Sequence, residues 1–201
     1  MNRVIQILLL LLLSSTIPSF AQQGEELTGT RREAVVKSIT TATQQVKQLE
    51  CSFRQKRESK MLSEEIESTG TMEYNSPDHL QWNYTSPSSY GLQVDGDKVK
   101  IHGKGPSNGA IPRQVKAMSR LIVGCVNGNQ LFDERLFKFS LYEDEGCFYI
   151  LLVPKRKEMQ KTFQSILFTF DKQKLTANSI VLTEKSGEKT VISFHDIKVK
   201  Y

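Results

Sequence analysis

The stretch between Gly70 and Gly103 places its bulky apolar side chains at every second position. These residues are Met72, Tyr74, Leu80, Trp82, Tyr84, Leu92, Val94, Val99 and Ile101. Alternation of this kind is typical of β-strands, in which successive side chains point to opposite faces. The pair Asp95-Gly96 is a strong hairpin signal between two such strands. The pattern therefore predicts consecutive short antiparallel strands with one apolar face.

Two segments have helical spacing instead. Apolar residues recur three to four positions apart from Thr30 to Leu49, with charged residues between them. A second stripe runs from Val115 to Cys125 and ends at Asn127-Gly128. It follows a loop rich in glycine, proline and serine, so we expect loop and helix to form an insertion that crosses a sheet.

From Phe137 to the end of the chain, strand-like segments alternate with turns about every 10 residues. This spacing predicts an antiparallel all-β sheet and not strand-helix-strand units. The segment Phe148–Val153 is apolar at every position, which predicts a central strand covered on both sides. The fold class expected from the pattern is α+β, mainly β.

The N-terminal 21 residues have the features of a signal peptide. Arg3 precedes a short apolar run, and Ser19-Phe20-Ala21 fits a cleavage site. The run of about 10 residues is shorter than the roughly 20 that a membrane-spanning helix needs. We expect residues 1–21 to be removed on export, leaving residues 22–201 as one domain.

Charge excludes some functions. The formal net charge is +5 at pH 7, too small and too scattered for the basic face of a nucleic-acid-binding protein. Two basic runs, Lys98–Lys104 and Pro154–Lys161, are either solvated rims or contacts to an acidic partner or anionic lipid headgroups, including transient contact with a membrane surface.

The residue types that carry catalysis or bind metals do not form a motif. His79, His102 and His195 lack metal-ligand spacing, and we expect neither a metal nor a cofactor nor enzymatic activity. The acidic group Glu64, Glu65 and Glu67 is predicted to lie in a solvated hairpin turn.

The three cysteines, Cys51, Cys125 and Cys147, are expected to be buried thiols. One disulfide is possible, but the sequence does not select the pair. The large apolar surface itself fits either a packed core or a cavity.

Several segments together resemble the LolA-type periplasmic lipoprotein carriers, and more closely a Bacteroidetes-like branch. The most specific is GTMEYNSPDHLQWNYTSP, followed by the hairpin LQVDGDKVKIH; the helix MSRLIVGCVNGN and the C-terminal segments FTFDKQ and SGEKTVISF also match. In order, these segments cover nearly all of residues 22–201.

The resemblance implies a strongly curved antiparallel sheet, an unclosed half-barrel, with helices across its concave face. The cavity between them would receive acyl chains. Leu80, Trp82 and Tyr84 match the family's cavity-lining aromatic strand, with Met72 and Tyr74 on the strand before it. The full set of expected acyl-chain-binding residues is Phe53, Met72, Tyr74, Leu80, Trp82, Tyr84, Leu92, Val94, Met118, Leu121, Ile122, Phe139 and Phe168.

The resemblance also implies partners and a location. They are acylated lipoproteins, an inner-membrane release complex and an outer-membrane acceptor, with a monomeric carrier in the periplasm. One departure concerns Ser76, where many family members carry an arginine that holds the lid; a serine does not offer the five donors of a guanidinium. The alternatives are a sensor of lipids or lipoproteins with the same fold, a protein or enzyme for a small hydrophobic ligand, and a β-sandwich with a filled core.

Overall fold

The computed structural model describes residues 24–59, 64–96, 98–103, 113–126 and 130–201. The predicted signal peptide and residues 104–112 of the predicted loop lie outside these ranges. The described elements, in chain order, are β1 (Glu25–Glu26), α1 (Gly29–Gln44), β2 (Gln48–Ser59), β3 (Glu64–Asn75), β4 (His79–Ser86), β5 (Tyr90–Asp95), β6 (Lys98–Gly103), α2 (Arg113–Val126), β7 (Phe137–Glu143), β8 (Cys147–Pro154), α3 (Lys157–Gln160), β9 (Phe163–Asp171), β10 (Ala177–Glu184) and β11 (Lys189–Lys200).

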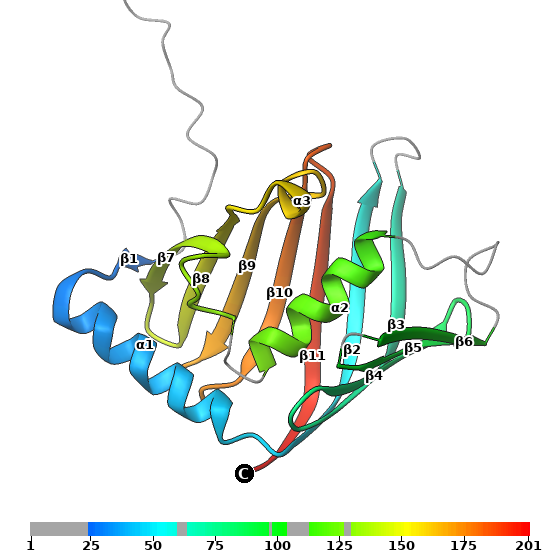
Figure 1. Ribbon diagram of the computed structural model, residues 1–201, viewed down its shortest axis with the longest axis horizontal. Helices are drawn as coiled ribbons and strands as arrows, with labels where there is room; N and C mark the ends of the chain where they lie inside the picture. Colours follow the sequence, from blue (N-terminus) through cyan, green and yellow to red (C-terminus); the bar gives the residue numbers. More distant parts are fainter. Residues whose placement is uncertain (1–23, 60–63, 97, 104–112, 127–129) are drawn as a thin grey trace, which may run out of the picture.

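The described strands form one antiparallel sheet of 11 strands in the order β1-β7-β8-β9-β10-β11-β2-β3-β4-β5-β6. The two edge strands do not pair with each other, so the sheet is open. Figure 1 shows it curling partly around α1 and α2, which lie across the same face. The predicted fold class, an unclosed half-barrel with helices over its concave face, is confirmed.

The strand register puts the apolar side chains on this concave face. Cys51, Met72, Trp82, Leu92 and Ile101 are successive cross-strand partners from β2 to β6. A second row runs through the other half of the sheet, and its members are Ile150, Phe168, Ile180 and Ile192. All of these side chains are buried except Ile101, which is partly buried and packs against the core. The consecutive antiparallel strands predicted between Gly70 and Gly103 are confirmed as β3 to β6.

Helices α1 and α2 each turn buried side chains to the sheet. In α1 the buried side chains are Val35, Ile39 and Thr43, spaced by one helical turn. The helix ends at Gln44, five residues before the predicted end at Leu49. The prediction was wrong there because Val46 is buried from the connection, and Leu49 already belongs to β2, where it pairs with Tyr74.

Two further predictions are corrected. The segment Ser63–Ser68, expected as a turn, belongs to β3 from Glu64 onward. Its carboxylates face basic residues of β2: Glu65 pairs with Lys56, and Glu67 lies 3.4 Å from Arg54. Cross-strand pairing of opposite charges stabilises a long hairpin that a count of charged residues does not reveal.

Strand β8 is covered on one face and not on both. Phe148, Ile150 and Leu152 are buried, whereas Val153 on the other face is 41% exposed. Helices α1 and α2 lie across the concave face (Figure 1), and the convex side of this apolar strand remains partly open to solvent.

Gly70 of β3 provides a test of the packing. A Cβ at this position would lie 2.6 Å from Cζ of Phe53 and collide with the backbone oxygen of Asn83. We expect Gly70→Ala to lower the free energy of unfolding by about 2–3 kcal/mol, because the ring of Phe53 and strand β4 must both shift. Urea denaturation measures it.

The matched control is Gly146→Ala, whose added methyl group meets no atom within 4 Å. Equal stability of the two variants would show that β3 and β4 are not packed as described.

Candidate functional site: an apolar cavity under two helices

A small cavity lies between the concave face of the sheet and the two helices. Its volume is about 50 Å³, and its wall is almost entirely apolar. The sheet contributes residues from β2, β3, β9, β10 and β11, and the cover comes from α1, α2 and the connection after α1. The lining residues are Thr43, Val46, Leu49, Cys51, Met72, Ile122, Cys125, Val126, Phe168, Phe170, Leu175, Thr176, Ala177, Ile180, Phe194 and Ile197.

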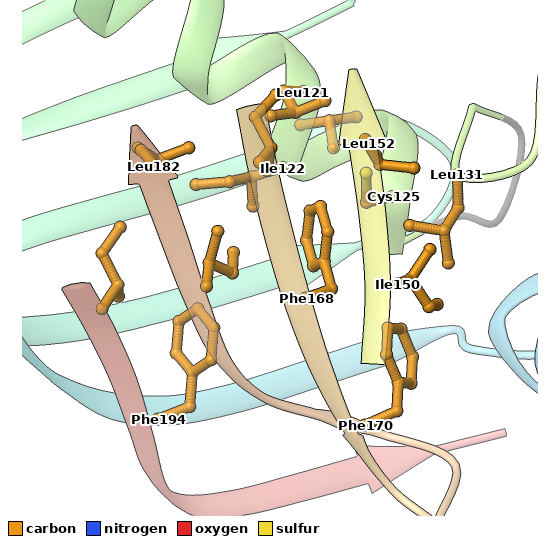
Figure 2. Close-up of a cluster of buried hydrophobic side chains, with 14 of the residues drawn as sticks. Leu121, Ile122, Cys125, Leu131, Ile150, Leu152, Phe168, Phe170, Leu182 and Phe194 are labelled. Atoms are coloured by element: carbon orange, nitrogen blue, oxygen red, sulfur yellow. The ribbon is translucent and has the colours of Figure 1, made fainter. Parts of the chain in front are cut away.

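The inner face of α2 forms the roof. Figure 2 shows Leu121, Ile122 and Cys125 pointing from the helix toward side chains of the sheet, among them Phe168. Ile122 and Cys125 line the cavity, while Leu121 packs in the adjoining core. All three are at most 4% exposed. A carrier lid would need this apolar underside.

The cavity is too small for a guest in this structure. A volume of about 50 Å³ holds a few waters at most, at roughly 10–15 Å³ each, and is far less than an alkyl chain needs. Access for a chain therefore requires the space to widen, as it does if a helix moves away from the sheet.

Three of the predicted acyl-binding residues line the cavity, namely Met72, Ile122 and Phe168. Phe53, Trp82 and Tyr84 instead pack against one another beside it. The ring centroids of Phe53 and Trp82 are 4.2 Å apart, and Tyr84 stands edge-on to Phe53 at 5.3 Å. Trp82 is fully buried, and its Nε1 makes no hydrogen bond within the described part of the chain.

The other predicted residues have mixed positions. Tyr74, Leu80, Leu92 and Val94 are buried on the concave face of β3 to β5 but do not line the cavity. Phe139 lies on β7 below the guanidinium of Arg32, at 4.2 Å. The side chain of Met118 lies outside the described residues. Assignment of any of these residues to an acyl site stays a prediction.

The sequence-based site omitted several residues that line the cavity, notably Cys51, Cys125, Phe170 and Phe194. A signal existed for some of them. Phe170 continues the alternation from Phe168, and Cys125 is one turn beyond Ile122 on the helical stripe. Thr43 carried no such signal, because a polar residue is not expected in an apolar wall. Its hydroxyl can be buried there because it donates a hydrogen bond to the carbonyl of Ile39 within α1, at 2.8 Å.

Helix α1 is fastened to the sheet by a charged cluster at its N-terminal end. Arg31 donates two hydrogen bonds to Glu143 of β7, at 3.0 and 2.8 Å, and Lys172 lies 2.6 Å from the same carboxylate. These hydrogen bonds, first from Arg31 and then from Lys172, lower the pKa of Glu143 to about 2. The next residue, Arg32, stacks on Phe139 and lies 3.7 Å from Glu134.

Ser76, at the family's arginine position, lies exposed between β3 and β4. Its backbone N–H donates to the carbonyl of Lys47 at 2.8 Å, in the connection that follows α1. The neighbouring Tyr74 hydroxyl donates to the carbonyl of Pro77 at 2.9 Å. Beside Ser76, the Gln48 side-chain amide donates to Oδ1 of Asn75 at 3.0 Å. These hydrogen bonds join uncharged groups, whereas a charged tie of α1 to the sheet lies at the other end of the helix, at Arg31.

The polar chemistry of the cavity is limited to thiols and two threonines. Burial raises the pKa of Cys51 to about 12 and raises that of Cys125 as well. All three cysteines are free thiols. Within the described ranges, no three His, Cys, Asp or Glu side chains are grouped as a metal site would require.

The chain matches one known protein family. A family model described as "Outer membrane lipoprotein carrier protein LolA" matches residues 44–201. A search of curated protein sequences finds no match. None of the helices in the described part combines the length and hydrophobicity of a membrane span.

Solved structures show distant likeness. A chain of the MucA/MucB complex of Pseudomonas aeruginosa has a TM-score of 0.47 at 10% identity, over 85% of this chain and 58% of that one. A LolA superfamily protein from Nitrosomonas europaea has a TM-score of 0.45 at 10% identity, over 83% and 94%. A DUF1329 family protein from Desulfovibrio piger has a TM-score of 0.43 at 10% identity, over 84% and 92%. The chain spans just over half the length of the MucA/MucB match, and these likenesses are too distant to carry an argument.

Removal of the Glu143 charge tests the fastening of α1. We expect Glu143→Gln to lower the free energy of unfolding by about 1 kcal/mol at pH 7. This is the size of contribution that ion pairs near the protein surface make. The pKa of Glu143 is depressed from 4.5 to about 2, so the carboxylate stabilises the fold fully above pH 4.5 and progressively less as pH falls toward 2. The difference between wild type and variant should shrink over that range in urea titrations.

Glu158→Gln is the matched control, because Glu158 is exposed and pairs only with Lys161 of the next turn, at 3.2 Å, among the described residues. A Glu143→Gln effect that is no larger than the control, or that is independent of pH, would contradict the cluster.

Alkylation rates test the burial of the thiols. At pH 8 a thiol of pKa about 12 is ionised on the order of 10⁻⁴ of the time, and only the thiolate reacts. We expect iodoacetamide to modify Cys147, which is partly exposed, at least about 100-fold faster than Cys51 and Cys125. Peptide mapping by mass spectrometry gives the three rates, and equal rates would show that the cavity is open to water.

Proposed function

This chain belongs to the LolA family of outer membrane lipoprotein carrier proteins, and from that premise we propose that it carries lipoproteins by binding their acyl chains. The guest lies between the concave sheet and helix α2, in a widened form of the cavity at Met72, Ile122 and Phe168. One observation carries the proposal: an apolar cavity enclosed by the sheet and both helices, in a fold with an open edge.

Free energies of burial favour exchange of the lid for a guest. Lifting α2 exposes Leu121, Ile122 and Val123, at a cost of about 1.5–3 kcal/mol for each side chain. One acyl chain of about 16 carbons gains roughly 13 kcal/mol when its methylenes leave water, at about 0.8 kcal/mol each. A single chain therefore more than offsets the displacement of this part of α2. The empty carrier closes because its own lid is the next best cover for the same surface.

The two helices take different roles in this proposal. Helix α1 is tied to β7 through Arg31 and Glu143, so it serves as the fixed wall. Helix α2 is the moving lid. In the open state the aromatic cluster of Phe53, Trp82 and Tyr84 becomes part of the binding surface.

The pathway around the carrier follows from the same premise. A lipoprotein leaves an inner-membrane release complex, crosses the periplasm on the carrier and passes to an outer-membrane acceptor. The signal peptide in residues 1–21 directs export. No covalent chemistry and no cofactor are required, because transfer depends only on relative burial of the acyl chains.

A cavity-filling substitution separates a binding site from a packed core. Ala177 lines the cavity from β10 and is partly buried. We expect Ala177→Leu to weaken binding of a fluorescent acyl probe by about tenfold while leaving the free energy of unfolding equal or about 1 kcal/mol higher, as cavity filling does. Fluorescence titration and urea denaturation give the two values.

Ala34→Leu on the exposed face of α1 is the matched control and should change neither value. Failure of the wild type to bind the probe would refute the carrier proposal. If Ala177→Leu binds the probe as the wild type does, the site is elsewhere. Transfer of a diacylated peptide between donor and acceptor vesicles then distinguishes a carrier from a sensor, which would bind without accelerating transfer.

A further inference from the structure

Strands β10 and β11 separate at the end of the sheet near the β9–β10 turn. Their pairing runs from Thr183 and Lys189 to Ser179 and Ser193 and stops there. Beyond it, β11 continues to pair with β2 as far as Lys200. Figure 1 shows this last part of β11 running on past the end of β10. The two strands thus form a fork, flanked by residues 171–178 on one side and 194–201 on the other.

Backbone irregularities occur on both sides of the fork. The register of β10 shifts between Ala177 and Ser179, and that of β11 shifts between His195 and Lys198. Among the described residues, Leu175 and Asp196 are the two non-glycine residues with positive φ, at 52° and 53°, and each flanks the fork. Bulges and left-handed residues cost free energy and concentrate where a sheet is shaped for function.

Local hydrogen bonds hold both irregular segments in place. The Asp171 carboxylate accepts the backbone N–H groups of Gln173 and Lys174, each at 2.8 Å. On the other side, the Ser52 hydroxyl lies 2.9 Å from Oδ2 of Asp196 and 3.3 Å from the carbonyl of His195. The opening is therefore fixed by specific contacts and is not a frayed strand end.

The fork contains a hollow of about 510 Å³, larger and more polar than the apolar cavity. The two spaces share Thr176, Phe194 and Ile197 in their walls. These residues lie at the boundary between an apolar interior and a polar exterior. Two carboxylates, Asp171 and Asp196, and one ammonium, Lys174, carry the charge of the outer space.

We propose that the fork is a side mouth of the acyl cavity, which holds the polar glyceryl and peptide end of an acylated peptide while the chains lie inside. This inference rests on the proposed function. An apolar cavity that shares part of its wall with a polar hollow matches the two ends of an amphiphile. An excess of carboxylate over ammonium disfavours phosphate or carboxylate head groups, so the preferred guest has an uncharged or cationic polar end, as a glyceryl-linked peptide has.

Photo-crosslinking locates the polar end. p-Benzoylphenylalanine is placed at Lys174 in the mouth, at Lys185 at the far end of β10, or at Lys98 on the edge strand β6; all three side chains are exposed. Each variant is first shown to bind a fluorescent acyl probe and is then loaded with a synthetic diacylglyceryl peptide. We expect crosslinks to the peptide at Lys174 and none at Lys185 or Lys98.

The outcomes separate the two claims. If the variants bind the acyl probe but the peptide crosslinks at Lys98 or Lys185 and not at Lys174, the mouth is wrong and the carrier proposal stands. If neither wild type nor variants bind the acyl probe, the proposed function fails and the mouth fails with it.

A substitution in the mouth gives a second test. Asn178 lines the polar hollow and not the apolar cavity. Asn178→Trp should weaken binding of the diacylglyceryl peptide by about tenfold and leave binding of decanol, whose head group needs no mouth, unchanged. Ile66→Trp is the matched control, because Ile66 is 42% exposed on β3. An equal effect of Asn178→Trp on both ligands, including no effect on either, would overturn the mouth.

Discussion

The whole structure depends on the burial of one broad apolar face by two helices. An open sheet of 11 strands presents a continuous apolar surface from β7 to β5, and the described strands include no second sheet that would cover it. Helices α1 and α2 supply the cover, with Ile39 and Ile122 at the centres of their buried stripes. A helix contacts such a surface along a narrow stripe, whereas a second sheet would interdigitate across it. The cover can therefore be displaced without dismantling the sheet, which a sandwich core would not allow.

The two ends of this cover differ in their physical chemistry. Helix α1 is held by charged groups, with Glu143 between Arg31 and Lys172, and these bonds do not compete with an apolar guest. The inner face of α2 is held by hydrophobic contacts, which are the same kind of interaction that an acyl chain offers. In the proposed function a guest therefore replaces α2 and leaves α1 in place. The proposed mouth between β10 and β11 would then give polar groups a route that does not require the lid to remain open.

Much of the fold follows from sequence pattern, and the errors have local causes. Alternation located β3 to β5 with their turns, and helical spacing located α2, because each has one apolar face. The charged first part of β3 was not predicted as a strand. A segment containing Glu65 and Glu67 is typical of a turn, and only the structure shows Lys56 and Arg54 opposite them on β2. The end of α1 was missed because Val46 and Leu49 are buried from outside the helix.

The site was harder to predict than the fold. Pattern identifies which side chains face inward, yet every inward side chain is a candidate, and only packing decides which of them leave space. Trp82 and Phe53 fill one end of the concave face, while the cavity forms farther along, beneath Ile122 and Cys125. The fork depends on two strand bulges and on positive φ at Leu175 and Asp196. A leucine or an aspartate in the sequence does not predict this backbone conformation.

The central claim is that acyl chains are buried against the concave face. Calorimetric titration with lipopeptides that differ only in acyl length tests it most directly. If the chains enter the cavity, each added methylene strengthens binding by about 0.8 kcal/mol, a factor of roughly four, until the opened space is full. Affinity that does not change with chain length would show that the chains remain outside, and would contradict the account.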